Sequence, residues 1–481
     1  MLRRIIQQKR GNRINWLNKQ KETGHDSNDS DASLSSDDEE EVSKGTVGEW
    51  FNDQYFCIKY LGKGTFSRVW LVYNIEDREF YAMKIILPKY YKEGKHELKM
   101  TQLLKSSNKD TRLVQTKDVF IYSKNKNTIC IIAELMGICM IDLFKKYDHN
   151  TIPESLIKMI FTDILKGLSE MHSKNIIHTD LKSENIMLNI FSNKIIKIKE
   201  WFSGLCINDI YENMINTELP ENYSEMNPNK RKKIKRKCRI RARGKFSEYY
   251  LEKSKEYDEI ISKLRLEKIE DIKEINDFDE VDEIELNDID YTDDFTYDES
   301  IQLVTKIIDF GNAEHFDNRD QDEIQLRYYR PPENIINEYY DTKSDIWTLG
   351  CILFEVITGE YLFDIDKNKK SIEKDREHIH QMYEMFGKMP RKMTDECDFS
   401  EDLFDSKGRI LKHKQCNYTN LKTELIEEYN IDSEKADILS NLLGNMFKYD
   451  PKERYSANDC LNHPWFRNNG NNGNNVRIYI I

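Results

Sequence analysis

The sequence of 481 residues lacks long hydrophobic runs. A membrane-spanning helix needs roughly 18–20 consecutive apolar residues, and no window approaches this number, so we expect no transmembrane segment. Residues 1–10 are basic and contain no apolar stretch of the kind that a secretory signal carries, so we expect no such signal. No internal repeat of solenoid length is present, which argues against a repeat architecture.

Paired-cysteine patterns are also absent. The nine cysteines are an odd number, and no two of them form a CxxC pair. This pattern predicts reduced thiols in a cytoplasmic or nuclear protein rather than a disulfide framework or a zinc site. The net charge of −13 disfavours bulk binding to nucleic acid and is compatible with a basic partner.

The composition divides the chain into five parts. Only 38% of the residues are hydrophobic whereas 33% are charged, so part of the chain contributes to no core. Residues 26–41 hold eight acids and five serines, and they predict that the tail 1–48 is disordered. Globular patterns cover 49–191 and 303–467. Between them lies a charged insert, 192–302, which we expect to be largely disordered, and 468–481 is a low-complexity tail.

The insert carries two runs of opposite charge. Residues 230–245 contain eleven lysines and arginines, whereas residues 267–299 contain sixteen acids and two lysines. The basic run has three interpretations: a nuclear-localisation signal, which we favour, a site for an anionic partner, or an intramolecular counterweight to the acids. Apolar residues at helical spacing between the two runs allow one short amphipathic helix.

Two features of the first globular part suit phosphate binding. A glycine turn lies between two strand patterns, where backbone N–H groups can approach phosphates closely. The turn comprises Leu61, Gly62, Lys63, Gly64, Thr65, Phe66, Ser67, Arg68 and Val69. Lys84 follows in an apolar strand pattern, where a lysine is costly unless it is paired, and Glu97 on the next predicted helix is the candidate partner. Taken alone, a common hairpin and an edge lysine that reaches solvent explain both features.

Further candidate residues come later in the chain. His178-Thr-Asp180-Leu-Lys182-Ser-Glu-Asn185 precedes a short apolar strand pattern, and Asp309-Phe-Gly311 follows another. A capped turn, a surface lysine or a strand end explains each piece separately. In this order, however, the motifs together match the signature set of the protein kinases, and the chain resembles that superfamily.

The resemblance implies an α+β, bilobal kinase fold, with a small β-rich lobe, a larger helical lobe and ATP between them. Asp180 would be the catalytic residue that orients the substrate hydroxyl and accepts its proton, and Lys182 would balance charge on the phosphoryl group. Asn185 and Asp309 would supply the oxygen ligands that Mg²⁺ prefers. The remaining ATP contacts would be the glycine turn together with Ala82, Lys84, Glu97, Ala133, Glu134 and Met136.

Three further residues match structural positions of kinases. Glu333 stands where kinases carry the glutamate of an Ala-Pro-Glu motif, and Arg454 resembles its ion-pair partner. Asp345 resembles the buried aspartate that holds the catalytic loop. We expect these residues to support the fold rather than the reaction.

Within the kinases, the chain is similar to the SR protein kinases, which phosphorylate serines in Arg-Ser repeats. The similarity rests on residues 61–84, Thr179 in the catalytic loop, the segments 309–313 and 358–393, and the position of the insert. It implies a monomeric Ser/Thr kinase that uses ATP and Mg²⁺ on Arg/Ser-rich proteins, with no direct binding to nucleic acid or membrane. The alternatives are a LAMMER-type or other Ser/Thr kinase with different substrates, and a pseudokinase scaffold.

The chain differs from the family at two positions and matches it at one further site. The family usually has Asp-Leu-Gly rather than Asp-Phe-Gly, and kinases generally carry threonine where this chain has Leu326, which predicts some loss of rate. Asp375, Glu377 and Glu384 match acids of the family's docking groove and would bind substrate arginines. A solvated helix face is the simpler interpretation of these acids.

Overall fold

The protein is described from a computed structural model. The structure describes residues 46–122, 127–147, 152–276, 302–319, 321, 323–336, 339–397, 399–412 and 418–467, with the side chains of all but residues 260–276, 396 and 400. Within these ranges, no helix is both long and apolar enough to cross a membrane. Most of the expected tail 1–48, the tail 468–481 and the later part of the acidic run lie outside the described residues.

The small lobe is an antiparallel sheet with the strand order β1-β2-β3-β4-β6-β5. Its strands are β1 (Trp50–Phe51), β2 (Tyr55–Lys63), β3 (Ser67–Asn74), β4 (Glu79–Ile86), β5 (Thr116–Ile121) and β6 (Ile129–Glu134). β-Branched and aromatic residues, which favour strands, fill β3 and β6. A 3₁₀ turn, Pro88–Tyr90, leads into α3 (Tyr91–Leu103), which packs near β6.

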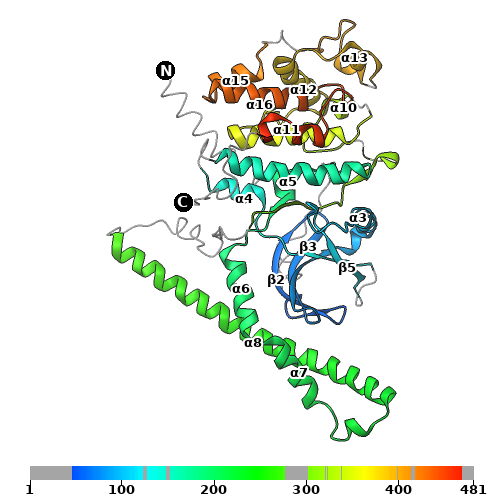
Figure 1. The fold of residues 1–481 in the computed structure, drawn as a ribbon, viewed down its shortest axis with the longest axis vertical. Coiled ribbons are helices and arrows are strands. Elements are labelled where there is room, and N and C mark those ends of the chain that lie inside the picture. The colour runs from blue at the N-terminus through cyan, green and yellow to red at the C-terminus, as the bar shows by residue number, and fades with distance from the viewer. Residues whose placement is uncertain are drawn as a thin grey trace.

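The large lobe is mainly helical and lies above the sheet in Figure 1. Its helices are α4 (Met140–Lys145), α5 (Glu154–Ser173), α10 (Pro332–Ile335), α11 (Lys343–Thr358), α12 (Ser371–Phe386), α13 (Arg391–Glu396), α14 (Ser400–Leu403), α15 (Leu421–Glu427), α16 (Ser433–Met446), α17 (Ala457–Leu461) and α18 (Pro464–Arg467). The bilobal α+β fold is therefore confirmed. α11 is buried along most of its length, with Trp347 in the main core.

Two short ladders join the parts of the chain before and after the insert. Strand β7 (Ile176–Ile177) pairs with β10 (Glu314–His315), and β8 (Ile186–Leu188) pairs with β9 (Thr305–Ile307). The insert therefore leaves the large lobe from one strand of a ladder and returns to its partner, so that residues far apart in the sequence meet.

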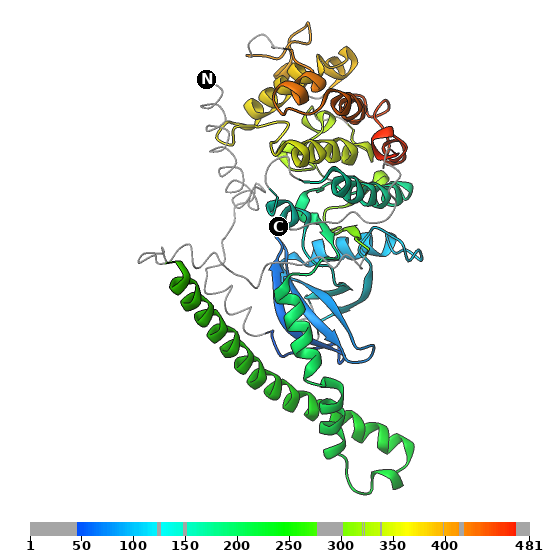
Figure 2. The ribbon, with the colours of Figure 1, turned by 60° about the vertical axis from the view of Figure 1, so that its left-hand side comes forward.

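The first part of the insert forms three helices: α6 (Asn193–Gly204), α7 (Ile207–Thr217) and α8 (Pro228–Asn276). Figures 1 and 2 show α6 beside the sheet and α8 running past the small lobe. The expectation of a largely disordered insert is therefore wrong for residues 193–276. The short amphipathic helix expected between the charge runs is part of the much longer α8.

The basic run conceals an apolar stripe that explains this helix. Cys238, Ala242, Phe246 and Tyr250 recur every four residues, so they share one face of α8. All four are buried in a cluster with apolar residues of α6, α7, β2 and β3. The hydroxyl of Tyr250 donates a hydrogen bond to the backbone oxygen of Ile58 at 2.9 Å. Burial of this apolar stripe stabilises the folded state of α8. The charged composition of the insert alone does not predict this stabilisation.

Candidate active site

Lys84 lies between two carboxylates. Its Nζ is 2.7 Å from Oε1 of Glu97 on α3 and 2.8 Å from Oδ1 of Asp309, which follows β9. Burial opposes the charge on Lys84, but Asp309 and Glu97 outweigh burial and raise its pKa. Burial likewise opposes the charge on Asp309, yet Lys84 lowers the pKa of that carboxyl to about 2. Lys84 and Asp309 are therefore both charged at neutral pH, and the predicted contact between Lys84 and Glu97 is present.

The glycine turn is a hairpin between β2 and β3. The backbone N–H of Gly64 donates to the oxygen of Ser67 at 3.0 Å, and Gly62 lies opposite Val69 in the ladder. A Cβ atom at Gly62 would meet nothing within 4 Å, so packing within the chain does not require this glycine. The backbone of the turn is therefore open to a ligand, and all nine residues predicted to contact ATP here belong to this hairpin.

Small side chains line the sheet next to Lys84. Ala82 of β4 lies opposite Ala133 of β6, and opposed residues of an antiparallel pair share a face. Lys84 is two residues from Ala82, so it shares that face as well. The carboxylate of Glu134, at the end of β6, accepts hydrogen bonds from Nζ of Lys306 at 2.7 and 2.8 Å. Sequence reasoning did not find Lys306, which ties the hinge to β9.

Met136 lies in the crossing from β6 to the large lobe. The next residue, Gly137, passes very close to the chain: a Cβ atom there would lie 1.7 Å from the backbone oxygen of Ile190. Only glycine fits this position, and its N–H donates to the oxygen of Leu188 at 2.7 Å. The crossing where the adenine contacts are predicted is therefore held against the large lobe through its backbone.

The catalytic-loop residues lie together between β7 and β8. Nζ of Lys182 is 3.1 Å from Oδ2 of Asp180, and Nδ2 of Asn185 donates to the backbone oxygen of Asp180 at 2.9 Å. Nδ2 of Asn312 contacts the same Oδ2 at 3.4 Å. Burial opposes the charge on Lys182, but Asp180 outweighs it and raises the pKa of the lysine. The carboxyl group of Asp180 and the charged amine of Lys182 thus lie side by side.

Asn185 and Asp309 suit a hard cation. The β8–β9 ladder brings their segments together, since the N–H of Ile308 donates to the backbone oxygen of Asn185 at 2.9 Å. Because its amide nitrogen points to Asp180, Asn185 offers its side-chain oxygen on the other side. An amide oxygen and an ionised carboxylate fit Mg²⁺, which usually takes few protein ligands and several phosphate or water oxygens. Among the described residues, no cluster of three or more His, Cys, Asp or Glu forms an all-protein metal cage.

Asp345 of α11 anchors the catalytic loop, as predicted. Its fully buried carboxylate accepts from the N–H groups of His178 at 2.8 Å and Thr179 at 3.2 Å. It also lies 2.9 Å from the ring nitrogen Nε2 of His172 on α5. These contacts fix the backbone that carries Asp180.

Gln325 is a residue that sequence reasoning missed. Its Nε2 donates to Oδ1 of Asp345 at 2.9 Å, and its Oε1 accepts from the N–H of Leu181 at 2.8 Å. Its own N–H donates to the oxygen of Thr179 at 2.7 Å, with a positive φ of 63°. Its neighbour Leu326 packs against the apolar core of the large lobe. The effect of Leu326 on rate stays a prediction.

Glu333 and Arg454 form the expected buried ion pair. Two nitrogen–oxygen contacts of 2.8 Å join the guanidinium to the carboxylate, and both side chains are fully buried. Ser344 at the start of α11 also donates to Glu333 at 2.7 Å. The pair therefore fastens α10 and the end of the large lobe to α11.

The three predicted docking acids all lie on α12. Asp375 is bound to Arg327 at 2.6 Å, and Glu377 is bound to Lys369 at 2.7 Å. Glu384 lies 3.5 Å from His380 on the same helix. The acids thus already hold basic groups of this chain, which their sequence positions did not reveal.

Comparison with known proteins agrees with this geometry. A family model described as the protein kinase domain matches residues 55–212 and 294–466. The serine/threonine-protein kinase SRPK of Physarum polycephalum is 29% identical over 91% of this chain and 93% of that protein. The putative serine/threonine-protein kinase L205 of Acanthamoeba polyphaga mimivirus is 30% identical over 92% of this chain and 95% of that protein. SRSF protein kinase 3 of Mus musculus is 25% identical over 90% and 91%, respectively.

The gap in the family match, residues 213–293, lies within the insert, and the strands of both ladders fall in the matched parts on either side of it. The relatives cover nearly the full chain and are serine/threonine kinases by name. The relatives named SRPK and SRSF protein kinase 3 show that the chain is similar to the SR protein kinases. The chain belongs to the protein kinase family, and the protein is an ATP-dependent serine/threonine kinase.

Proposed function

We propose that this kinase phosphorylates serines in Arg/Ser-rich proteins and uses Mg²⁺ as its metal. The observation that carries the substrate proposal is that two acids of α12 hold a guanidinium and an ammonium group. The guanidinium belongs to Arg327, which is two residues after Gln325, a residue that binds the catalytic loop. The name of the mouse relative, SRSF protein kinase 3, supports the same substrate class.

The proposed reaction uses the groups around Asp180. A substrate serine hydroxyl donates to the Asp180 carboxylate, which takes its proton as the serine oxygen attacks the γ-phosphorus and the bond to the β–γ bridging oxygen breaks. Lys182, 3.1 Å from Asp180, balances charge on the phosphoryl oxygens. Asn185 and Asp309 would hold Mg²⁺, which would neutralise phosphate charge.

The proposed ATP site follows the face that carries Lys84. Lys84 binds the α- and β-phosphates while Glu97 fixes its position, and the open backbone of the glycine turn covers the phosphates. The paired Ala82 and Ala133 leave room for a flat adenine ring, which the backbone near Glu134 and Met136 binds through hydrogen bonds.

The proposed docking site works by exchange of cations. Glu377 is largely buried, with its side chain 18% exposed, whereas the side chain of its partner Lys369 is 40% exposed. An incoming substrate arginine, which can bind a carboxylate through two parallel hydrogen bonds, replaces the exposed lysine, which binds as a single point charge. A further arginine of the same tract pairs with Glu384.

We also propose that the protein works as a monomer in the cytoplasm, the nucleus or both. The described cysteines are free thiols, which suits a reducing compartment. The basic run, residues 230–245, is the proposed nuclear-localisation signal. Because Cys238 and Ala242 of that run are buried, a carrier that reads an extended peptide has to bind the run outside this packed part.

The substrate proposal is tested by reversing the docking charges. Glu377→Lys/Glu384→Lys is compared with wild type and with Glu373→Lys, an exposed glutamate of the same helix, on a long Arg-Ser substrate over a range of salt concentrations. We expect the double variant to raise KM by about tenfold or more, to flatten its salt dependence and to keep kcat. Equal KM values for the double variant, the control and wild type at low salt contradict the docking site.

A further inference from the structure

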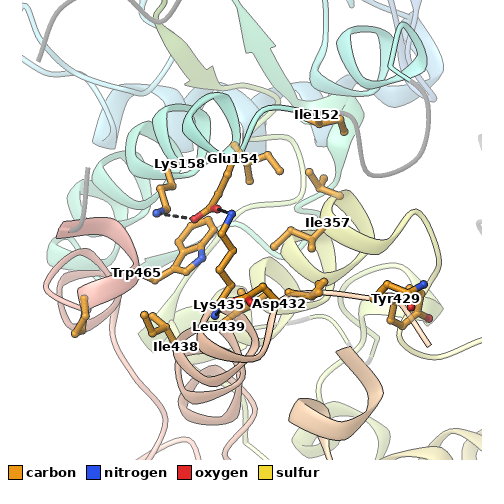
Figure 3. A pocket seen from close by; sticks show the side chains of 15 residues that line it. Ile152, Glu154, Lys158, Ile357, Tyr429, Asp432, Lys435, Ile438, Leu439 and Trp465 are labelled. Carbon is orange, nitrogen blue, oxygen red and sulfur yellow. Dashed lines mark hydrogen bonds and ion pairs between the residues drawn. The ribbon is translucent and has the colours of Figure 1, made fainter. Parts of the chain in front are cut away.

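A pocket lies on the large lobe between α5, α11, α16 and α18 (Figure 3). Its volume of about 370 Å³ is within the range of about 300–1,000 Å³ in which proteins hold small ligands. Its walls are mainly apolar and include Ile157, Ile357, Ile438, Leu439, Pro464 and Trp465. None of its lining residues belongs to the proposed sites for ATP, Mg²⁺ or substrate, so the pocket needs another explanation.

The charged groups at one side of the pocket satisfy each other. Glu154 accepts from Nζ of Lys158 at 2.7 Å and from Nζ of Lys435 at 3.1 Å, as the dashed lines in Figure 3 show. The ammonium of Lys158 also lies 5.1 Å from the ring centre of Trp465. Since these charges already have partners, the apolar walls are what the pocket offers an occupant, and a fitting occupant is chiefly aliphatic or aromatic.

The chain leaves the described structure at a wall of this pocket. Trp465 is two residues before Arg467, where α18 and the described residues end. Residues 468–475 are Asn-Asn-Gly-Asn-Asn-Gly-Asn-Asn, and residues 476–481 are Val-Arg-Ile-Tyr-Ile-Ile. A polar linker is thus followed by a segment in which every residue but Arg477 is apolar.

We propose that residues 476–481 dock in this pocket of the same chain. The apolar side chains of the segment cover Trp465, Ile438 and the neighbouring wall, and Arg477 stays at the rim, where Asp432 is exposed. The inference depends on the pocket and the linker alone, so it holds whatever the substrate of the kinase is.

The linker has the length that this docking requires. Eight extended residues span at most about 27 Å, and a flexible linker of this length has a root-mean-square span of about 16 Å. Because Trp465 is itself a wall of the pocket, the segment reaches the opening without strain. A short linker holds the segment at an effective concentration in the millimolar range, so an intrinsic Kd of about 0.1 mM is enough to fill the pocket.

Other segments outside the described residues fit less well. Residues 148–151, which precede the pocket residue Ile152 in the sequence, are Asp-His-Asn-Thr and therefore polar, and residues 277–300 are acidic. Residues 1–17 contain apolar side chains, but that part of the chain joins the structure at Thr46, on the small lobe beside α8. Residues 476–481 combine apolar character with an attachment point in the pocket wall.

Binding in trans is the first test. A fluorescein-labelled peptide of residues 474–481 is titrated into the protein ending at Asn475, and fluorescence anisotropy is expected to give a Kd of about 0.1 mM or tighter. Ile438→Asp is expected to weaken binding by about tenfold or more, whereas Ile240→Asp, at an exposed position of α8, leaves it unchanged. A peptide with Ile480→Asp tests the same contact without altering the pocket. The full chain is expected to bind the peptide at least about tenfold more weakly, because its own segment competes.

Photocrosslinking in the full chain is the second test. A photoreactive amino acid at position 480 is expected to crosslink to α16 or α18 within one chain, while kinase activity stays at the wild-type level. Crosslinks to the small lobe, or products of twice the mass that place the segment on a second copy, overturn the proposal. It is also overturned if the full and shortened chains bind the peptide equally, or if a co-purified amphiphile fills the pocket while the segment stays accessible to protease.

Discussion

Nε2 of Gln325 donates a hydrogen bond to Oδ1 of Asp345 at 2.9 Å, in the buried centre of the large lobe. The same glutamine accepts from Leu181 in the catalytic loop, and the same aspartate accepts from His178 and Thr179. The catalytic loop and the segment that follows Asp309 are therefore held by the same pair, Gln325 and Asp345. No phosphate is needed to make these bonds.

This pair of residues predicts activity without phosphorylation of the segment. In many kinases a phosphate on this segment binds the arginine before the catalytic aspartate, but here Thr179 replaces that arginine, and residues 312–331 contain no serine or threonine. Protein made in bacteria and treated with phosphatase should keep its full kcat. If phosphatase abolishes activity and an upstream kinase restores it, the prediction fails.

Gln325→Ala should lower kcat/KM by about ten- to a hundredfold, because both loops lose a shared buried hydrogen bond and the site shifts. Gln321→Ala, which removes a neighbouring glutamine contact to the oxygen of Asn312, serves as the matched control and should have a smaller effect. Steady-state kinetics on one peptide decide between them. Equal losses in the two variants would show that Gln325 has no special role.

The packing of α8 predicts a local stability effect. Phe246 is fully buried between the insert and the sheet, and truncation of a buried phenylalanine typically costs about 3–5 kcal/mol. Phe246→Ala should therefore increase amide hydrogen exchange in α8 and β2, whereas Ile240→Ala at an exposed site of the same helix should not. Hydrogen-exchange mass spectrometry measures both. Unchanged protection of β2 in Phe246→Ala would mean that the helix does not stabilise the sheet.

The sequence predicts the catalytic residues and those supporting residues that belong to the same motifs. Asp180, Asn185 and Asp309 can be found because the chemistry fixes their residue types and their order along the chain. Lys84 and Glu97 can be paired in advance because a lysine in an apolar strand needs a carboxylate. Buried structural partners such as Glu333 and Arg454 follow from the same motif set.

Other features depend on contacts that no motif encodes. Gln325 acts through a left-handed backbone conformation and a buried neighbour, neither of which a single glutamine signals. The stripe of α8 is hidden because lysines and arginines stand at every second position between Cys238 and Phe246. The partner of Asp375 is Arg327, 48 residues away, so the contact that this predicted docking acid makes within the chain became visible only in the fold.

Removal of the Glu97 charge should impair ATP use. In Glu97→Gln, Lys84 keeps its contact with Asp309 but loses the carboxylate that fixes its position, so kcat/KM for ATP should fall by about tenfold or more. Glu93→Gln, at an exposed position of the same helix, is the control. ATP titrations at fixed peptide concentration test this. A wild-type kcat/KM for ATP in Glu97→Gln would show that the Glu97 carboxylate does not contribute to ATP use.

The small side chain of Ala133 predicts an unusual inhibitor profile. A methyl group opposite Ala82 leaves space behind the adenine, so inhibitors with a bulky aromatic arm should bind about ten- to a hundredfold better than they bind Ala133→Phe. The KM for ATP should change only slightly. Inhibition of both proteins by a bulky pyrazolopyrimidine is the measurement, and equal potency would show that neighbouring side chains fill the space.

The transfer of labelled phosphate from ATP to matched peptides tests the central claim most directly. An Arg-Ser repeat peptide, a Lys-Ser peptide of the same length and casein are compared with wild-type protein and with Asp180→Ala. We predict that the Arg-Ser peptide is preferred by about tenfold or more, and that Asp180→Ala reduces transfer by at least about a hundredfold. Equal labelling of the Arg-Ser peptide, the Lys-Ser peptide and casein, or full labelling by Asp180→Ala, would contradict the account.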